Sequence, residues 1–322
     1  MKIVICCTRN WYIHLATMLY ALFKHNKIEK VYLFIEDDEI SYLKDKRIEF
    51  ININKTQDYI SKNSPNYYTK YTKLSLIRCY FSKILKEDKI LYIDADALIV
   101  DNIEELWNID LEGYVLAGVK EEGEWDKHLG IEGLNGKYIN SGVLLINLKK
   151  IREEKLDDEM IYLLNKNKYA YPDQDVINII CKNKIKYIEP IYNSAITTGI
   201  VDNAKIIHYI RDDKGWISGK FRSEIWYNYH IEMLGGVNMD NFKVRATKNF
   251  DDITVQDEKG RNVKRVKDKS EWFCSKERYE YLKSNNAVEL IEVEKVELPQ
   301  VEEQLESKVE VKPKKKKTSK KK

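Results

Sequence analysis

The stretch Ile90-Leu-Tyr-Ile-Asp-Ala-Asp-Ala-Leu-Ile-Val100 places two carboxylates, Asp94 and Asp96, inside an otherwise apolar run. A run so rich in Ile, Leu and Val predicts a strand that is buried on both faces of a sheet. Because an unpaired buried carboxylate is costly, we expect the strand to end just before Asp94, where the chain leaves the core. The carboxyl end of a central strand is where open α/β sheets bind ligands, and both carboxylates can face a divalent cation there.

Apolar runs and helical periodicities alternate along the rest of the chain. The strands predicted from these patterns cover residues 2–7, 30–36, 48–53, 89–93, 114–119, 138–148, 186–191 and 205–210. The predicted helices cover residues 14–25, 72–85, 153–166 and 173–181. Because strands and helices alternate, the predicted fold class is α/β, with a mostly parallel sheet flanked by helices on both faces.

The character of the chain changes after Gly235-Gly236. A small α+β module is predicted next, with strands near 242–247, 262–266 and 287–293 and a helix over 276–284 that Ser275 can cap. Residues 289–310 then hold eight Glu and two Lys, and residues 311–322 hold eight Lys and no acid. Such a composition predicts a disordered, solvated tail. The expected parts are therefore residues 1–236, 237–293 and 294–322.

Whole-chain composition indicates a globular protein of a reducing compartment. Of the 322 residues, 43% are hydrophobic and 33% charged, and the net charge is +3. The five cysteines are scattered and form no CxxC pair, which is typical of cytosolic proteins. No apolar run approaches the roughly 18 residues of a membrane span, and the first apolar stretch is too short for a signal peptide. We expect a cytoplasmic protein with no membrane span and no specific nucleic-acid partner.

Two further polar clusters precede apolar elements. Asn140 and Ser141 lie at the entrance of a long apolar run, where an ordinary turn is the alternative interpretation. Asp173, Gln174 and Asp175 open a predicted helix. Helix capping accounts for a single Asp, but three consecutive polar groups exceed what a cap needs. Both clusters are therefore candidates for binding a ligand.

His208 ends a short predicted strand, and Lys214 follows six residues later. A lone His is more often a core residue than a ligand. Together with Asp94 and Asp96, however, His208 completes a mixed oxygen and nitrogen set that suits octahedral Mn²⁺. The chain has no Gly-rich phosphate loop of the P-loop or dinucleotide type, so a metal must do most of the neutralisation of a diphosphate. This combination predicts a nucleotide-sugar transferase, in which the metal and Lys214 stabilise the departing nucleoside diphosphate.

The order and spacing of these clusters resemble glycosyltransferase family 8, a retaining family that includes glycogenin and bacterial lipopolysaccharide galactosyl- and glucosyltransferases. The motifs are Tyr-Ile-Asp-Ala-Asp (92–96), Asn-Ser-Gly-Val-Leu-Leu-Ile-Asn-Leu (140–148), Asp-Gln-Asp (173–175) and His-Tyr followed by Lys-Gly-Trp (208–216). The resemblance covers roughly residues 1–230. It implies a GT-A fold and transfer of a hexose, glucose or galactose, from a UDP-sugar with Mn²⁺ or Mg²⁺. The implied acceptor is a glycan, a lipid-linked molecule or a protein.

The resemblance also implies roles for single residues. Asp94, Asp96 and His208 would bind the metal. Donor contacts would come from Thr8, Tyr12, Arg78, Asp94, Ala95, Asn140, Ser141, Lys214 and Gly215. Asp173, Gln174 and Asp175 would form the catalytic region, with Gln174 facing the anomeric carbon. A carboxamide is a poor nucleophile, so the implied mechanism is same-face attack by the acceptor. Gly215 replaces a common proline, which is expected to loosen its loop.

Other interpretations of the same residues stay open. A nucleotidyltransferase or phosphatase would use the Asp pair and leave Lys214-Gly-Trp216 without a role. A non-catalytic nucleotide-sugar-binding protein would keep the fold without turnover. Residues 241–293 resemble a small accessory protein found in bacteriophage genomes, which implies a phage or bacterial gene and a host or virion acceptor.

Overall fold

The computed structural model describes residues 1–69, 72–123, 125, 130, 134, 136–217, 219–234, 241–256, 262–269, 271–274, 282–283 and 286–294. The chain divides into two compact units. The first comprises Met1–Gly235 and Asp252–Val263, and the second comprises Gly236–Asp251 and Lys264–Lys322. The predicted disordered tail, beyond residue 294, and most of the predicted helix over 276–284 lie outside the described residues.

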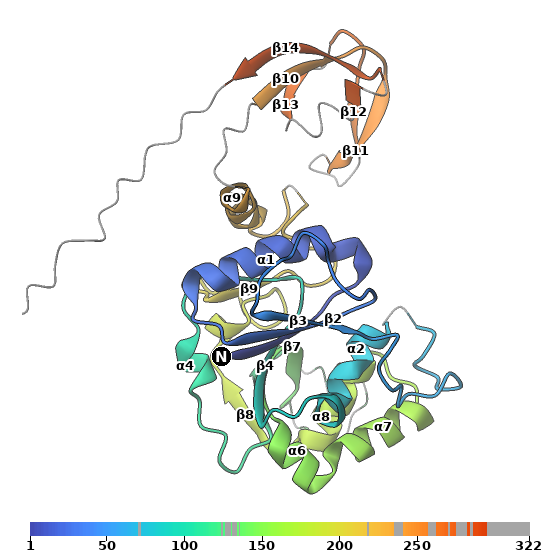
Figure 1. The fold of residues 1–322 in the computed structure, drawn as a ribbon, viewed down its shortest axis with the longest axis vertical. Helices are drawn as coiled ribbons and strands as arrows, with labels where there is room; N and C mark the ends of the chain where they lie inside the picture. Colours follow the sequence, from blue (N-terminus) through green and yellow to red (C-terminus); the bar gives the residue numbers. More distant parts are fainter. Residues whose placement is uncertain are drawn as a thin grey trace, which may run out of the picture. The chain divides into compact units, whose positions relative to one another are not determined.

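A seven-stranded sheet with the strand order β3-β2-β1-β4-β7-β6-β8 forms the centre of the first unit (Figure 1). Its strands are β1 (Lys2–Cys6), β2 (Lys30–Ile35), β3 (Ile48–Asn52), β4 (Lys89–Ile93), β6 (Leu116–Lys120), β7 (Ile139–Asn147) and β8 (Ile185–Ile188). The β1–β2, β2–β3, β1–β4 and β6–β8 pairings are parallel, and the two pairings of β7 are antiparallel. The predicted mixed, mostly parallel sheet is confirmed.

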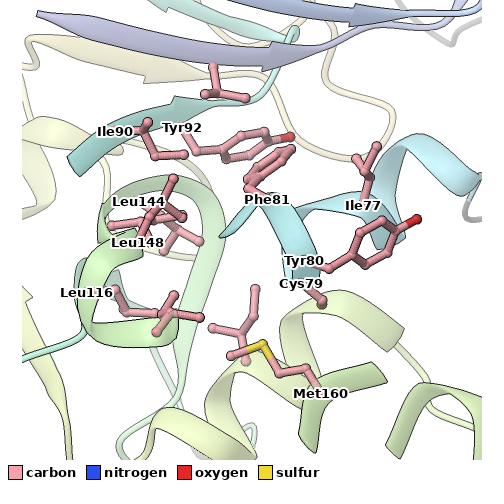
Figure 2. Packing of buried hydrophobic residues seen from close by; sticks show 14 of the residues in the cluster. Ile77, Cys79, Tyr80, Phe81, Ile90, Tyr92, Leu116, Leu144, Leu148 and Met160 are labelled. Carbon is pink, nitrogen blue, oxygen red and sulfur yellow. The ribbon is translucent and has the colours of Figure 1, made fainter. Parts of the chain in front are cut away.

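Strand β4 is buried on both faces, as its composition predicts. Leu91 and Ile93 belong to one apolar cluster, and Ile90 and Tyr92 belong to another on the opposite face (Figure 2). The first cluster also takes residues from α1 (Tyr12–His25) and α4 (Glu104–Trp107). The second takes residues from α2 (Lys73–Leu76), α3 (Phe81–Ile84), α6 (Leu148–Glu154), α7 (Leu156–Lys166) and α8 (Pro172–Cys181). Helices therefore cover both faces, and the strand can deliver polar groups only beyond its end.

The single helix predicted over 72–85 is instead three short pieces, α2, the 3₁₀ turn η2 (Ile77–Tyr80) and α3. Arg78 lies in the 3₁₀ turn, and its Nε donates to the Ser75 carbonyl oxygen at 3.1 Å. Tyr80 then leaves the helical region, with φ −139° and ψ 28°. The break accompanies burial of the Arg78 guanidinium, which apolar periodicity alone does not reveal.

Two other predicted boundaries are corrected. The helix expected to start at residue 153 is two helices, α6 and α7, because Asn147 caps α6 and Lys155 adopts a left-handed φ of 54° between them. Strand β8 ends at Ile188 rather than at residue 191. Pro190 has no backbone N–H to donate to a neighbouring strand. It begins the 3₁₀ turn η3 (Pro190–Tyr192) instead.

A second, two-stranded sheet lies next to the end of β4. Strands β5 (Ala97–Ile99) and β9 (Ile206–His208) pair antiparallel, with Ala97 opposite His208. Helix α9 (Ser223–Met233), which the patterns did not predict, packs on α1 through the Thr17 hydroxyl and His230 Nδ1, 2.8 Å apart. No helix in the described part of the chain is long and apolar enough to cross a membrane.

In the second unit, β10 (Asn241–Ala246) pairs antiparallel with both β13 (Glu271–Cys274) and β14 (Val288–Glu294). Strands β11 (Phe250–Gln256) and β12 (Asn262–Arg265), whose residues are divided between the two units, form a separate two-stranded sheet. Strands β10, β12 and β14 coincide with the three strands predicted for this region.

Candidate active site

A pocket of about 640 Å³ opens beyond the carboxyl end of β4. Most of the residues predicted for the site line it, namely Thr8, Arg78, Asp94, Ala95, Asp96, Asn140, Ser141, Asp173, Gln174 and His208. Four others lie outside the lining that the described residues form, namely Tyr12, Asp175, Lys214 and Gly215. The structure thus brings together residues from the two ends of the first unit's sequence.

Asp94, Asp96 and His208 meet at one side of this pocket, the metal side. The β5–β9 pairing places His208 opposite Ala97, one residue beyond Asp96. His208 Nε2 lies 3.3 Å from Asp96 Oδ1 and 3.6 Å from Asp94 Oδ2. One ligand atom from each of the three residues lies within 4.8 Å of the others. The arrangement is that of a mixed carboxylate and imidazole metal site.

Gly142 leaves the room that this cluster occupies. A Cβ at residue 142 would lie 2.1 Å from His208 Cε1 and 2.8 Å from Asp94 Oδ2. Any side chain here would displace both groups, so the close approach requires glycine. Two hard carboxylate oxygens and one imidazole nitrogen are a donor set that Mn²⁺ and Mg²⁺ accept. The residues present therefore fit a divalent cation.

Asp94 is oriented by two donors on one of its oxygens. Arg78 Nη2 donates to Asp94 Oδ1 at 2.8 Å, and the Tyr92 hydroxyl donates to the same oxygen. This leaves Oδ2 facing His208. Burial opposes the charge of Arg78, but Asp94 and Tyr92 beside it raise the pKa of the guanidinium well above its usual range. Arg78 is thus a buried cation that directs Asp94, and it also lines the pocket.

Lys214 neutralises Asp96 from the opposite direction. Its Nζ donates to Asp96 Oδ2 at 2.5 Å and to the Tyr209 carbonyl oxygen at 2.7 Å. Burial alone would raise the pKa of Asp96, but hydrogen bonds and charge from His208 and Lys214 hold it well below the usual range. The ammonium lies 4.8 Å from the ring centroid of Trp11, which lines the pocket, so Lys214 stands at its border.

Gly215 is more tightly packed than a loosened loop predicts. A Cβ there would lie 2.8 Å from the Tyr209 ring and 2.9 Å from Trp226 Cβ. The glycine therefore allows the loop of Lys214 to press against an aromatic wall. Close packing therefore gives a second reason for the glycine, and the looser loop stays a prediction.

The other side of the pocket, the amide side, is a network of amides and carboxylates. Ser141 Oγ donates to Asp173 Oδ2 at 3.1 Å, and Ser141 N donates to Gln174 Oε1 at 2.9 Å. Asn140 Nδ2 and Gln174 Nε2 both donate to Glu121 Oε1, at 2.8 and 3.4 Å. Burial raises the pKa of Asp173, and Arg78 Nε, 3.2 Å from Asp173 Oδ2, works against this shift. Polar groups here converge from β6, β7 and α8.

Asp175 and Tyr12 lie outside the described lining of the pocket, and hydrogen bonds hold each of them. The Tyr138 hydroxyl donates to Asp175 Oδ1 at 2.5 Å, and the Tyr171 backbone N–H donates to Oδ2 at 2.9 Å. Burial raises the pKa of Asp175, and the Tyr138 hydrogen bond opposes that shift. Tyr12 belongs to α1 and donates its hydroxyl to Asp37 Oδ2 at 3.0 Å. In this arrangement both residues support the walls of the site.

Sequence reasoning missed several residues of the pocket. Glu121 is 5% exposed, and its Oε2 has no hydrogen-bond partner in the described structure. The Thr197 hydroxyl, which also lines the pocket, is likewise buried with no partner among the described residues. Trp11, Trp125 and Tyr171 add aromatic surface. Glu121 follows a predicted strand, a signal that could have identified it, whereas Thr197 lies in an irregular segment with no pattern.

Comparison with known proteins agrees with this geometry. The model of glycosyl transferase family 8 matches residues 2–219. A Haemophilus influenzae protein named as a glycosyltransferase is 37% identical over 187 residues, 52% of this chain and 53% of the relative. The lipopolysaccharide 1,2-glucosyltransferase of Escherichia coli is 33% identical over 149 residues, 40% of this chain and 44% of the relative. This chain therefore spans about half the length of these relatives.

A solved structure shares the architecture. The galactosyltransferase LgtC, crystallised with donor and acceptor sugar analogues, superposes with a TM-score of 0.56 and 21% identity. The superposition covers 72% of this chain and 96% of that one. At this identity the likeness concerns the fold, which is of the GT-A type. Because the family model covers well over half of the sequence, this chain belongs to glycosyl transferase family 8.

Proposed function

We propose that this protein is a metal-dependent, retaining hexosyltransferase. It would move glucose or galactose from a UDP-sugar to a glycan, lipid-linked or protein acceptor. The observation that carries the proposal is the meeting of Asp94, Asp96 and His208, with ligand atoms within 4.8 Å, beside a pocket rich in amides and carboxylates. These three residues would hold Mn²⁺ or Mg²⁺, which when bound supplies Lewis-acid neutralisation of a diphosphate.

Lys214 supports the departure of the nucleoside diphosphate. Its ammonium is 2.5 Å from Asp96 Oδ2, so it stands beside the carboxylate that would hold the cation and can meet a diphosphate bound to that cation. A fixed cation costs little reorganisation when negative charge builds on the leaving oxygen. The Trp11 ring beside it excludes water from one side. Lys214 would therefore lower the barrier for breaking the bond between the sugar and the phosphate.

The amide side supplies groups that suit a polyhydroxyl ligand. Glu121 Oε2 offers an acceptor and Thr197 Oγ1 offers a donor, both buried and without partners in the described part of the chain. A buried polar atom without a partner costs free energy, which hydroxyls of a bound sugar would recover. Asn140, Ser141 and Asp173 add further hydrogen-bonding capacity beside them.

Gln174 favours same-face attack over a covalent enzyme intermediate. Its two amide atoms are engaged by Ser141 N and Glu121 Oε1, and a carboxamide is a poor nucleophile. The acceptor hydroxyl oxygen would bond to the anomeric carbon as the bond from that carbon to the phosphate oxygen breaks. The proton of the hydroxyl would pass to the departing phosphate oxygen. Configuration is then retained because attack and departure share one face.

Calorimetric titration of the protein with UDP and Mn²⁺, followed by a hydrolysis panel of UDP-glucose, UDP-galactose and their N-acetyl forms, tests the proposal. Wild-type protein should bind UDP in a manner that chelator abolishes, and should hydrolyse at least one UDP-sugar slowly. Asp96→Asn should lose metal-dependent binding and most turnover, whereas Asp202→Asn, a fully exposed carboxylate, should lose neither. Turnover of nucleoside triphosphates or phosphomonoesters in place of UDP-sugars would instead support a nucleotidyltransferase or phosphatase.

A further inference from the structure

A buried chain of side-chain hydrogen bonds links the metal side of the pocket to its amide side through Asn193. We propose that Asn193 is a positioning residue that fixes the tautomer of His208 and couples it to Asn140 and Glu121. This inference rests on the proposed function, because it gives His208 its role as a metal ligand. Asn193 is 0% exposed and lies outside the pocket lining. It therefore acts through its neighbours and not on a ligand.

The orientation of Asn140 is the starting point, because two unambiguous partners fix it. The Gly142 backbone N–H donates to Asn140 Oδ1 at 2.9 Å, and a backbone N–H can only donate. Asn140 Nδ2 donates to the Glu121 carboxylate at 2.8 Å, and a carboxylate can only accept. The Asn140 amide is thus assigned without appeal to any tautomer.

The orientation of the Asn193 amide follows from that of Asn140, and the proton on His208 Nδ1 follows from Asn193. The Asn193 atom 2.9 Å from Asn140 Oδ1 must be a donor, so it is Nδ2. This leaves Asn193 Oδ1 as the acceptor 2.8 Å from His208 Nδ1, which must carry the proton. With a cation held at Asp94 and Asp96, His208 Nε2 would present its lone pair to that cation, as a metal-ligating imidazole does.

The backbone around Asn193 holds this geometry in place. Asn193 N donates to the Pro190 carbonyl oxygen at 3.0 Å, and its own carbonyl oxygen accepts from the Thr198 hydroxyl. The next residue, Ser194, accepts from His208 N at 2.9 Å. Asn193 is thus fixed to the strand that carries His208. A change at one end of the network should therefore reach the other end.

Two substitutions distinguish the hydrogen bond from Asn193 to Asn140 from the one between Asn193 and His208. Asn193→Asp keeps an acceptor for His208 Nδ1 but loses the donor to Asn140, and Asn193→Leu loses both. Calorimetric titration with Mn²⁺ alone should show a loss of roughly 10- to 100-fold for Asn193→Leu, the effect typical of partners that orient a metal ligand. Asn193→Asp should keep the wild-type Mn²⁺ affinity but lose the preference for a UDP-sugar over UDP. Equal Mn²⁺ affinity in Asn193→Leu and wild type would overturn the inference.

A measurement on wild-type protein keeps the inference testable if Asn193→Leu does not fold. Nitrogen NMR of ¹⁵N-histidine-labelled protein distinguishes the two neutral tautomers, and the His208→Gln spectrum identifies the signals of His208. With Mg²⁺, a diamagnetic cation, at the site we expect protonated Nδ1 and unprotonated Nε2. An Nε2–H tautomer in a protein that binds UDP with Mn²⁺ would refute the role of Asn193 and leave the proposed function standing. Absence of UDP–Mn²⁺ binding would refute the proposed function instead.

Discussion

His208 and His14 have the same side chain but opposite surroundings. His208 is buried among polar groups, with Asn193 Oδ1 at 2.8 Å from Nδ1 and two carboxylates near Nε2. His14 is stacked on Trp216, with ring centroids 4.1 Å apart and planes 5° from parallel. His14 Nδ1 has no hydrogen-bond partner among the residues described. Burial, and then the proximity of His230, lowers the pKa of His14 to about 4.

The difference separates a candidate metal ligand from a packing residue. A histidine that binds a cation needs a partner on one ring nitrogen and open, acidic surroundings at the other, and His208 has both. His14 provides a flat, uncharged ring behind the loop of Lys214, where Trp11 and Trp226 complete an aromatic cluster with Trp216. Around His14 the ring shape matters more than the nitrogens.

The same substitution at both positions gives the largest expected contrast. His208→Phe should weaken Mn²⁺ binding beyond the roughly 10- to 100-fold loss typical for a partner that only orients a ligand, because it removes a ligand outright. His14→Phe should leave Mn²⁺ affinity and UDP-sugar hydrolysis unchanged, since a phenyl ring can keep the stack on Trp216. Calorimetry and a hydrolysis assay measure both quantities. Equal losses in the two variants would show that the comparison is mistaken.

Gly142→Ala tests whether the position of the His208 ring matters for Mn²⁺ binding. The new methyl group would lie 2.1 Å from His208 Cε1, so His208 must move away from Asp94 and Asp96. We expect Mn²⁺ affinity to fall by roughly tenfold or more, the scale of an imperfectly oriented ligand. Titration with Mn²⁺ measures the loss, and a thermal melt should show that the variant still folds. Wild-type affinity in the folded variant would mean that His208 is not held where the site needs it.

The stability of the protein in acid tests the packing role of His14, and we expect the smallest effect in this measurement. In the folded protein His14 stays neutral down to about pH 4, whereas its ordinary pKa is 6.5 in the unfolded chain. Between these values the unfolded state binds a proton that the folded state does not, so acidification lowers the free energy of unfolding. His14→Phe lacks this contribution. Urea unfolding at pH 7, 5 and 4 should therefore show the variant losing less stability than wild type.

Much of this fold was predictable from local pattern. The apolar strand before Asp94 and the mostly parallel sheet are confirmed because burial on both faces leaves a continuous apolar run in the sequence. The broken helix around Arg78 was not predictable. Its cause is a guanidinium that must reach Asp94 and Ser141, and both lie on other elements.

The candidate site shows the same limit. Asp94, Asp96 and His208 were named from residue type and order, and the structure brings their ligand atoms together. Glu121 and Asn193 were missed, because their importance lies in hydrogen bonds to Asn140 and not in a motif.

The sequence by itself determined that a buried strand ends in two carboxylates, that strands and helices alternate, and that His208 and Lys214 follow in the order of a known family. These properties depend on residues near one another in the chain. Only the tertiary structure decided which histidine faces the carboxylates, since the β5–β9 pairing that brings His208 there joins distant segments. It also decided that Asn193 Oδ1 lies beside Nδ1 of that ring. A hydrogen-bond network has a direction only when every donor and acceptor is in place.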